Sequence, residues 1–204
     1  MFFSFDGIDG VGKSTQINLF VDWLRGQGQT VVACRDPGST PLGEQIRQLL
    51  LTHDSQLAIS RRAEMLLYMA ARAQLVEQVI RPALDRGETV VSDRFLLANV
   101  VYQAYAGGLD LEQVRQVGEV AIAGVRPDAV FLLDMPVAEA DRRLSRQLDR
   151  MESQGQEFRQ RLRDGFLAEA RLVPATIHVV DAAQSVDQVQ AEIRRVATTQ
   201  LFGK

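Results

Sequence analysis

The sequence predicts an α/β fold in which helices cover both faces of a parallel sheet. Short apolar runs, typical of buried strands, alternate along the chain with longer stretches of helical periodicity. The first apolar run leads through a glycine-rich segment, Gly7-Ile8-Asp9-Gly10-Val11-Gly12-Lys13-Ser14, into a helical stretch. At 204 residues the chain fits one domain spanning 1–204, with a small lid within it.

The individual elements follow from apolar periodicity and from glycine or capping signals at their ends. We expect strands at 1–5, 30–34, 89–92, 129–133 and 176–180. We expect helices near 13–26, 41–51, 60–86, 110–123, 136–148, 155–172 and 185–198. Two of these helices begin with a capping-box pattern, Asp110 with Gln113 and Ser185 with Gln188. Alternation of strands and helices predicts a parallel sheet with ligands beyond the carboxyl ends of its strands.

The glycine-rich segment is a complete G-x-x-x-x-G-K-[ST] pattern, which is a P-loop. Lys13 and Lys204 are the only lysines, and the other 21 of the 23 basic residues are arginine. A lysine retained here indicates a need for a compact charge that reaches the β- and γ-phosphates. The following helix adds its positive N-terminus, and the Ser14 hydroxyl is placed to bind Mg²⁺. The motif therefore predicts a nucleoside triphosphate site.

Composition excludes several other classes of protein. A net charge of −3 and a pI of about 5.5 give no basic surface for nucleic acid. No apolar run approaches the ~20 residues of a membrane span, and the N-terminus leaves no room for a signal peptide. The single cysteine, Cys34, cannot form an internal disulfide. These features predict a soluble cytoplasmic enzyme.

Charged residues follow several of the expected strands. Asp6, Arg35, Asp93 and Asp134 stand directly after the runs that end at 5, 34, 92 and 133. Parallel strands bring their carboxyl ends to one edge of the sheet, so we expect these groups to face the P-loop. Arg35 and Arg94 are suited to bidentate phosphate contacts, and Asp93 resembles a carboxylate that holds Mg²⁺ through water.

Two further segments carry candidate binding residues. Tyr68 and Arg72, at i and i+4 of a helix, are suited to stack on a base and read its edge, although a core tyrosine and a surface arginine would give the same pattern. Between 139 and 153 the chain is rich in arginine, which fits either an exposed helix face or a lid over the transferring phosphate. The variable P-loop positions carry no basic residue, which favours the lid.

The ordered motifs of the chain resemble those of the thymidylate kinase family, which phosphorylates dTMP to dTDP in dTTP biosynthesis. The matching blocks are FDGIDGVGKSTQ at 5–16, RDPGSTPLGEQIRQLL at 35–50, MLLYMAARAQLVEQVIRPAL at 65–84, SDRF at 92–95, VYQ at 101–103 and LDRME at 148–152. The resemblance covers essentially the whole chain. It implies a P-loop NTPase-type sheet of five strands in the order 2-3-1-4-5, ATP as donor, Mg²⁺ as cofactor, and a homodimer.

The resemblance also implies roles for individual residues. The ATP phosphates would be bound by Gly7, Ile8, Asp9, Gly10, Val11, Gly12, Lys13, Ser14 and Thr15, and Mg²⁺ by Ser14 and Asp93. Bound dTMP would be contacted by Asp9, Arg35, Asp36, Arg47, Tyr68, Arg72, Arg94, Asn99, Tyr102 and Gln103. Tyr68 would stack on thymine, Arg72 would contact a base carbonyl, and Tyr102 would exclude a 2′-hydroxyl. Lys13, Asp93, Arg94 and the lid residues Arg143, Arg146 and Arg150 would serve the transfer itself, as in the bacterial type with an arginine-bearing lid.

The chain departs from the family pattern at a few positions, and other functions stay open. Asp6 and Asp36 stand where glutamate is common, Phe95 where tyrosine is common, and Ala98 where serine is common. A kinase for dUMP or a deoxynucleoside, a GTP-binding switch and a paralogue that binds without turnover remain alternatives. The mechanism requires no protein nucleophile, so His53, His178 and Cys34 need no catalytic role. The sequence does not show whether the Asp36-Pro37 peptide bond is cis, but a cis bond would fit the tight turn beside the site.

Overall fold

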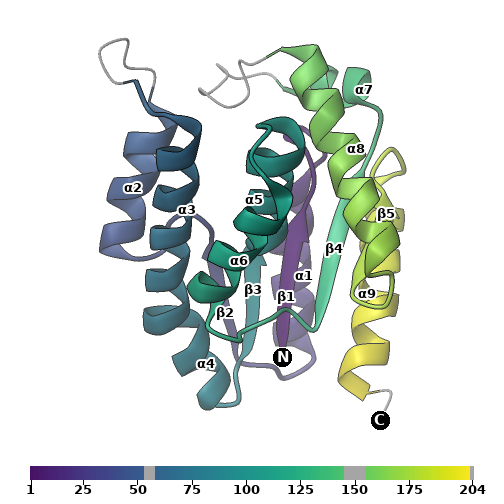
Figure 1. The fold of residues 1–204 in the computed structure, drawn as a ribbon. Helices are drawn as coiled ribbons and strands as arrows, with labels where there is room; N and C mark the ends of the chain where they lie inside the picture. Colours follow the sequence, from purple (N-terminus) through teal and green to yellow (C-terminus); the bar gives the residue numbers. More distant parts are fainter. Residues whose placement is uncertain (53–57, 145–154, 203–204) are drawn as a thin grey trace.

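The computed structural model describes residues 1–52, 58–144 and 155–202, and it has the predicted α/β architecture. A five-stranded sheet is flanked by helices on both faces (Figure 1). All strand pairs are parallel, and the strand order is β2-β3-β1-β4-β5. The predicted order 2-3-1-4-5 is therefore confirmed.

Each strand ends one residue later than the sequence predicts. The strands are β1 (Phe2–Asp6), β2 (Val31–Arg35), β3 (Thr89–Asp93), β4 (Ala129–Asp134) and β5 (Ile177–Asp181). The terminal charged residues stay in register with their neighbours, since Asp93 pairs with Phe5 on one side and with Arg35 on the other. The expectation that these groups lie just beyond the strands was wrong by one position, but they do gather at one edge of the sheet.

Most helices lie where apolar periodicity placed them. They are α1 (Lys13–Gly26), α2 (Pro41–Leu51), α3 (Arg61–Leu75), α4 (Arg81–Asp85), α6 (Leu111–Ile122), α7 (Val137–Arg143), α8 (Gln156–Leu172) and α9 (Val186–Phe202). The expected helix 60–86 is one continuous helical run in which a π-helical turn, η1 (Val76–Ile80), joins α3 to α4. The expected helix 136–148 ends at Arg143, where Leu144 becomes extended, and its remainder lies outside the described residues.

One helical segment was not predicted. Residues after β3 form α5 (Leu96–Asn99) and continue into a π-helix, η2 (Val100–Ala106). No side chain caps its start, and the run of β-branched Val100 and Val101 gives no local helical signal. Packing supplies the missing stability, because Val101 and Ala106 belong to the main core and Val100 and Ala104 to the cluster between α3 and α6.

Aromatic side chains of β1, α1 and β4 form the centre of the core. Phe3 meets Phe20 edge-on at a centroid distance of 5.3 Å, and the ring centroids of Phe5 and Phe131 lie 5.0 Å apart.

One of the two predicted capping boxes is complete. Ser185 and Gln188 form the reciprocal capping box, whereas Asp110 accepts from the Gln113 amide alone. Within the described residues, none of the helices combines the length and apolar composition that a membrane span requires.

Candidate active site

A cavity of about 540 Å³ opens at the carboxyl ends of the strands, between the P-loop and the helices α2, α3, α5 and α7. Nearly all described residues that the sequence proposed for binding line it. These are Asp9, Gly10, Val11, Gly12, Lys13, Ser14, Thr15, Arg35, Asp36, Arg47, Tyr68, Arg72, Asp93, Arg94, Asn99, Tyr102, Gln103 and Arg143. Arg146 and Arg150 lie outside the described residues. Six cationic and three anionic side chains line the described wall, a balance that suits phosphate groups.

The P-loop is held in shape by Lys13. Its ammonium donates to the carbonyls of Gly7 at 3.0 Å and Ile8 at 2.9 Å and lies 3.4 Å from the Asp9 carboxylate. Gly7 and Ile8 themselves do not line the cavity, so their predicted place in the phosphate site is limited to these backbone contacts. Burial and the neighbouring Arg94 lower the pKa of Lys13 from its ordinary value.

Gly10 is a position at which the P-loop requires glycine. Its φ of +93° lies in the left-handed region, and a Cβ atom there would stand 2.3 Å from the Ala140 carbonyl oxygen. The loop therefore packs directly against the backbone of α7. This contact places the end of α7, with Arg143, at the rim of the cavity, where Arg143 donates to the Ala182 carbonyl at 3.2 Å.

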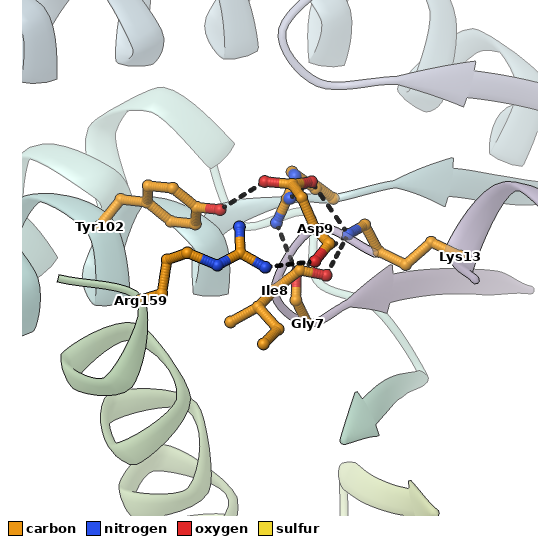
Figure 2. A network of polar contacts seen from close by, with 7 residues as sticks. Gly7, Ile8, Asp9, Lys13, Tyr102 and Arg159 are labelled. Atoms are coloured by element: carbon orange, nitrogen blue, oxygen red, sulfur yellow. Dashed lines mark hydrogen bonds and ion pairs between the residues drawn. The ribbon is translucent and has the colours of Figure 1, made fainter. Parts of the chain in front are cut away.

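Asp9 is the centre of a polar network that joins both sides of the cavity (Figure 2). Its carboxylate accepts from Arg94 at 2.6 Å and from the Tyr102 hydroxyl at 3.2 Å, and its backbone carbonyl accepts from Arg159 at 2.7 Å. Burial opposes ionisation of Asp9, but Arg94 and Lys13 outweigh it and hold its pKa well below the usual range. Burial raises the pKa of Tyr102 well above its ordinary value, so its hydroxyl stays a donor.

Arg94 reaches this network from an uncommon backbone conformation. Its φ is +69°, in the region that non-glycine residues avoid at a cost of about 1–2 kcal/mol. Its carbonyl is held by the Ser92 hydroxyl at 2.6 Å, and its guanidinium donates to the Gly7 carbonyl at 3.0 Å. This strained turn directs the Arg94 guanidinium toward the P-loop, whereas an extended backbone at this position would direct it elsewhere.

The opposite side of the cavity is built on a buried ion pair. Arg72, which is 1% exposed, donates to Asp36 at 2.6 Å, to the Phe95 carbonyl at 3.1 Å and to the Met69 sulfur at 3.2 Å. A guanidinium has five N–H groups, so two of them remain for a ligand. Arg72 is therefore not the surface arginine that the sequence left open. It is buried, and it also lines the cavity. The Asp36-Pro37 bond beside it is cis.

Arg35 and Arg47 border the cavity next to this pair. Arg35 forms an ion pair with Glu44 at 2.7 Å and is half exposed. Arg47 is partly buried and donates to the Pro37 carbonyl at 3.1 Å. Burial, together with the charge of Arg35, lowers the pKa of Arg47 from its ordinary value. Two cations held this close favour a bound anion between them.

The residues proposed for Mg²⁺ fit a hydrated ion. Asp93 has one carboxylate oxygen that is buried and, among the described residues, lacks a hydrogen-bond partner. Ser14 is exposed at the first turn of α1 and lines the same cavity. No group of three His, Cys, Asp or Glu side chains within the described ranges could hold a metal. Mg²⁺ usually binds through one or two carboxylates, water and phosphate, so Asp93 and Ser14 could supply its protein contacts.

Two contributors to the site were missed at the sequence level. Arg159 of α8 is 5% exposed and spans from the Asp9 carbonyl to Asp141 of α7, with its Nε 2.7 Å from the carboxylate. Glu64 of α3 lies behind the cavity and accepts from Gln103 at 3.1 Å. Neither residue belongs to a local motif, and both act across long sequence separations. The one sequence clue to each of them is weak, because it is only a charged residue at a position of a predicted helix that should otherwise be buried.

Comparison with known proteins gives a consistent result. The family model described as thymidylate kinase matches residues 5–193. The chain is 44% identical to a thymidylate kinase of Rhodopirellula baltica over 94% of this chain and 77% of that protein, and 46% identical to one of Bifidobacterium longum (strain DJO10A) over 95% of both. The crystal structure of thymidylate kinase from Ehrlichia chaffeensis superposes with a TM-score of 0.78 at 31% identity, covering 97% of this chain and 98% of that one.

Proposed function

The chain belongs to the thymidylate kinase family, and we propose that the described cavity transfers the γ-phosphoryl group of ATP to dTMP, which yields dTDP for dTTP synthesis. The observation that carries this proposal is the Asp9 network. It joins a P-loop on one side to a pocket with Tyr68, Arg72 and Tyr102 on the other. A donor phosphate and an acceptor nucleotide would therefore meet at the Asp9–Arg94 pair.

In the proposed mechanism the protein mainly positions charge. An oxygen of the dTMP phosphate attacks the γ-phosphorus in line, the bond to the β,γ-bridging oxygen breaks, and ADP leaves. Lys13 and the P-loop amides hold the donor phosphates. Arg94, with Arg35 and Arg47, holds the acceptor phosphate, and Arg143 adds positive charge at the rim. Bringing the two groups together and neutralising their charge accounts for most of the acceleration in such reactions.

We assign the acceptor side to the pyrimidine nucleoside. Tyr68 would stack on the base, and the two remaining N–H groups of Arg72 would meet a base carbonyl. The hydroxyl of Tyr102 is committed to Asp9, so its ring would stand beside the sugar where a 2′-hydroxyl would project. Asp9 would accept from the 3′-hydroxyl.

Mg²⁺ is part of the proposal. Its protein contacts would be Ser14 and the Asp93 oxygen that has no hydrogen-bond partner among the described residues. A Mg²⁺ ion held by these residues would supply positive charge that neutralises the donor phosphates. The arginines of the segment at 139–153 that lie beyond Arg143, namely Arg146 and Arg150, stay predictions. A cytoplasmic location also stays a prediction.

We also propose that the active protein is a homodimer whose contact face includes α3 and α6. Leu66 and Val120 on these helices are 49% and 81% exposed, and a second cavity of about 290 Å³ lies between them, lined by Met65, Leu109, Val114 and Val117 among others. Light scattering at micromolar concentration should give twice the chain mass, and Leu66→Glu should reduce it. A monomeric wild-type protein would contradict this part of the proposal.

The decisive experiment measures ADP release with ATP and Mg²⁺ against dTMP, dUMP, dCMP, dGMP, UMP and thymidine. We expect strong turnover with dTMP, weaker turnover with dUMP and negligible turnover with UMP. Faster turnover with thymidine would instead show a nucleoside kinase. No turnover with any acceptor, despite measurable ATP binding, would show a paralogue that binds nucleotide without transfer.

A further inference from the structure

Three buried polar side chains form a hydrogen-bonded row from α3 to the acceptor side of the cavity. Gln103 donates from Nε2 to the Glu64 carboxylate at 3.1 Å, and Asn99 donates from Nδ2 to the Gln103 Oε1 at 2.8 Å. Glu64 is 8% exposed, and the two amides are 3% exposed each. Asn99 and Gln103 line the cavity, whereas Glu64 lies behind them.

The row has a direction, and the carboxylate sets it. An ionised carboxylate only accepts hydrogen bonds, whereas an amide presents an acceptor on one side and donors on the other. Gln103 must therefore turn its NH₂ toward Glu64 and its oxygen toward Asn99. Asn99 must then turn its NH₂ toward Gln103, which leaves its own oxygen, Oδ1, for other contacts.

That oxygen is not committed to the described part of the protein. Asn99 Oδ1 accepts no hydrogen bond from any described residue. It is also absent from the fully buried polar atoms that lack a partner, so it is not sealed inside the core. Because Asn99 lines the cavity, this acceptor is available to a ligand bound there.

We propose that Glu64 is a positioning residue that fixes Asn99 as an acceptor for the ring N3–H of the acceptor base. The inference rests on the proposed function, because it concerns the base bound on the acceptor side. Thymine and uracil carry a hydrogen on N3, whereas cytosine has a lone pair there. An oxygen held opposite N3 attracts the first two bases and repels the third, so Glu64 selects against cytosine without touching the nucleotide.

Glu64→Gln tests this polarity without changing side-chain shape. A glutamine at 64 can donate to a reversed Gln103, which would reverse Asn99 and turn its NH₂ toward the base. We expect the ratio of kcat/KM for dTMP over dCMP to fall by about tenfold, the worth of one neutral hydrogen bond made or opposed. The ratio for dTMP over dUMP should stay unchanged, because both bases carry the N3 hydrogen.

Glu77→Gln provides the matched control, since Glu77 is 62% exposed on the same helical run and lies 4.0 Å from Arg81. This variant should keep both ratios. If Glu64→Gln lowers all three kcat/KM values equally, or leaves the dTMP to dCMP ratio intact, the proposal is overturned while dTMP kinase activity stands. Absence of dTMP turnover in the wild-type protein would instead refute the proposed function.

A second variant keeps the test valid if Glu64→Gln does not fold. When it is ionised, the aspartate of Asn99→Asp can present only acceptor oxygens to the base, whichever way Gln103 is turned. We expect it to retain the discrimination of dTMP from dCMP, even if the lost bond to Gln103 lowers overall activity. A loss of that discrimination in Asn99→Asp would show that the acceptor at this position is not what rejects cytosine.

Discussion

Asp6 should make the ligand-free protein less stable as the pH rises toward neutrality. The side chain is 0% exposed at the end of β1, and neither carboxylate oxygen has a hydrogen-bond partner among the described residues. Burial raises its pKa from 3.8 to about 7, against the attraction of Arg94 and Lys13. A raised pKa means that the folded state holds the proton more tightly than the unfolded state does. The stability that this proton confers is complete below pH 3.8 and is lost as the pH rises through 7.

The size of the effect follows from the two pKa values. With 3.8 in the unfolded and about 7 in the folded state, the contribution of Asp6 to the free energy of unfolding falls by roughly 2–3 kcal/mol between pH 5 and pH 8. Asp6→Asn has nearly the same shape and does not ionise. The variant should therefore gain about that much stability relative to wild type over this interval.

Urea unfolding of both proteins at pH 5, 6, 7 and 8, without nucleotide, measures this difference. Asp22→Asn is the control, because Asp22 also lies next to a cation but its side chain is 77% exposed on α1. The control should differ from wild type by a few tenths of a kcal/mol at every pH. A difference between Asp6→Asn and wild type that does not change with pH would show that burial of this carboxylate is compensated, and the reasoning would be refuted.

Three further outcomes follow from the site. Lys13→Ala should lower kcat/KM for dTMP phosphorylation by at least about 10²-fold, and near-normal ADP formation would contradict the P-loop mechanism. Arg72→Met should destabilise the fold by about 3–5 kcal/mol because Asp36 stays buried without its cation, and adding Asp36→Asn should restore part of that loss in urea unfolding. Arg159→Met should raise the KM for ATP several-fold through a loosened P-loop, whereas Arg161→Met, which changes an exposed arginine two residues further along α8, should leave it unchanged; equal KM values would contradict the positioning role.

The sequence was sufficient for the sheet and for the P-loop because both depend on local signals. Apolar runs and helical spacing placed β1 and α1, and the family resemblance supplied the strand order that the structure confirms. The helical segment 96–106 was missed since its stability comes from packing against α3, α6 and α8 rather than from caps or helix-favouring residues. Local patterns cannot report such support.

The same distinction between local signals and long-range contacts applies to the site residues. Arg94 and Asp93 could be placed at the edge of the sheet because they follow an apolar run, and both line the cavity; their roles stay predictions. The burial of Arg72 on Asp36 and the contacts of Glu64 and Arg159 join segments that lie far apart in the sequence, and the ion pair of Arg35 with Glu44 joins the end of β2 to α2. Composition and spacing along one chain leave no trace of such contacts, so the three-dimensional arrangement was needed to see them.

The contact between Gly10 and α7 constrains how this enzyme could be redesigned. One way to rebuild the site would be to move a positive charge from the rim, where Arg143 lies, into the loop itself. Position 10 is closed to it, because any side chain would collide with the Ala140 carbonyl. Ile8 and Val11 are each 2% exposed and pack in the core, Val11 at the wall of the cavity, and Asp9 is already bound on both of its oxygens. An engineer, or natural selection, would have to displace α7 before position 10 could accept a positive charge.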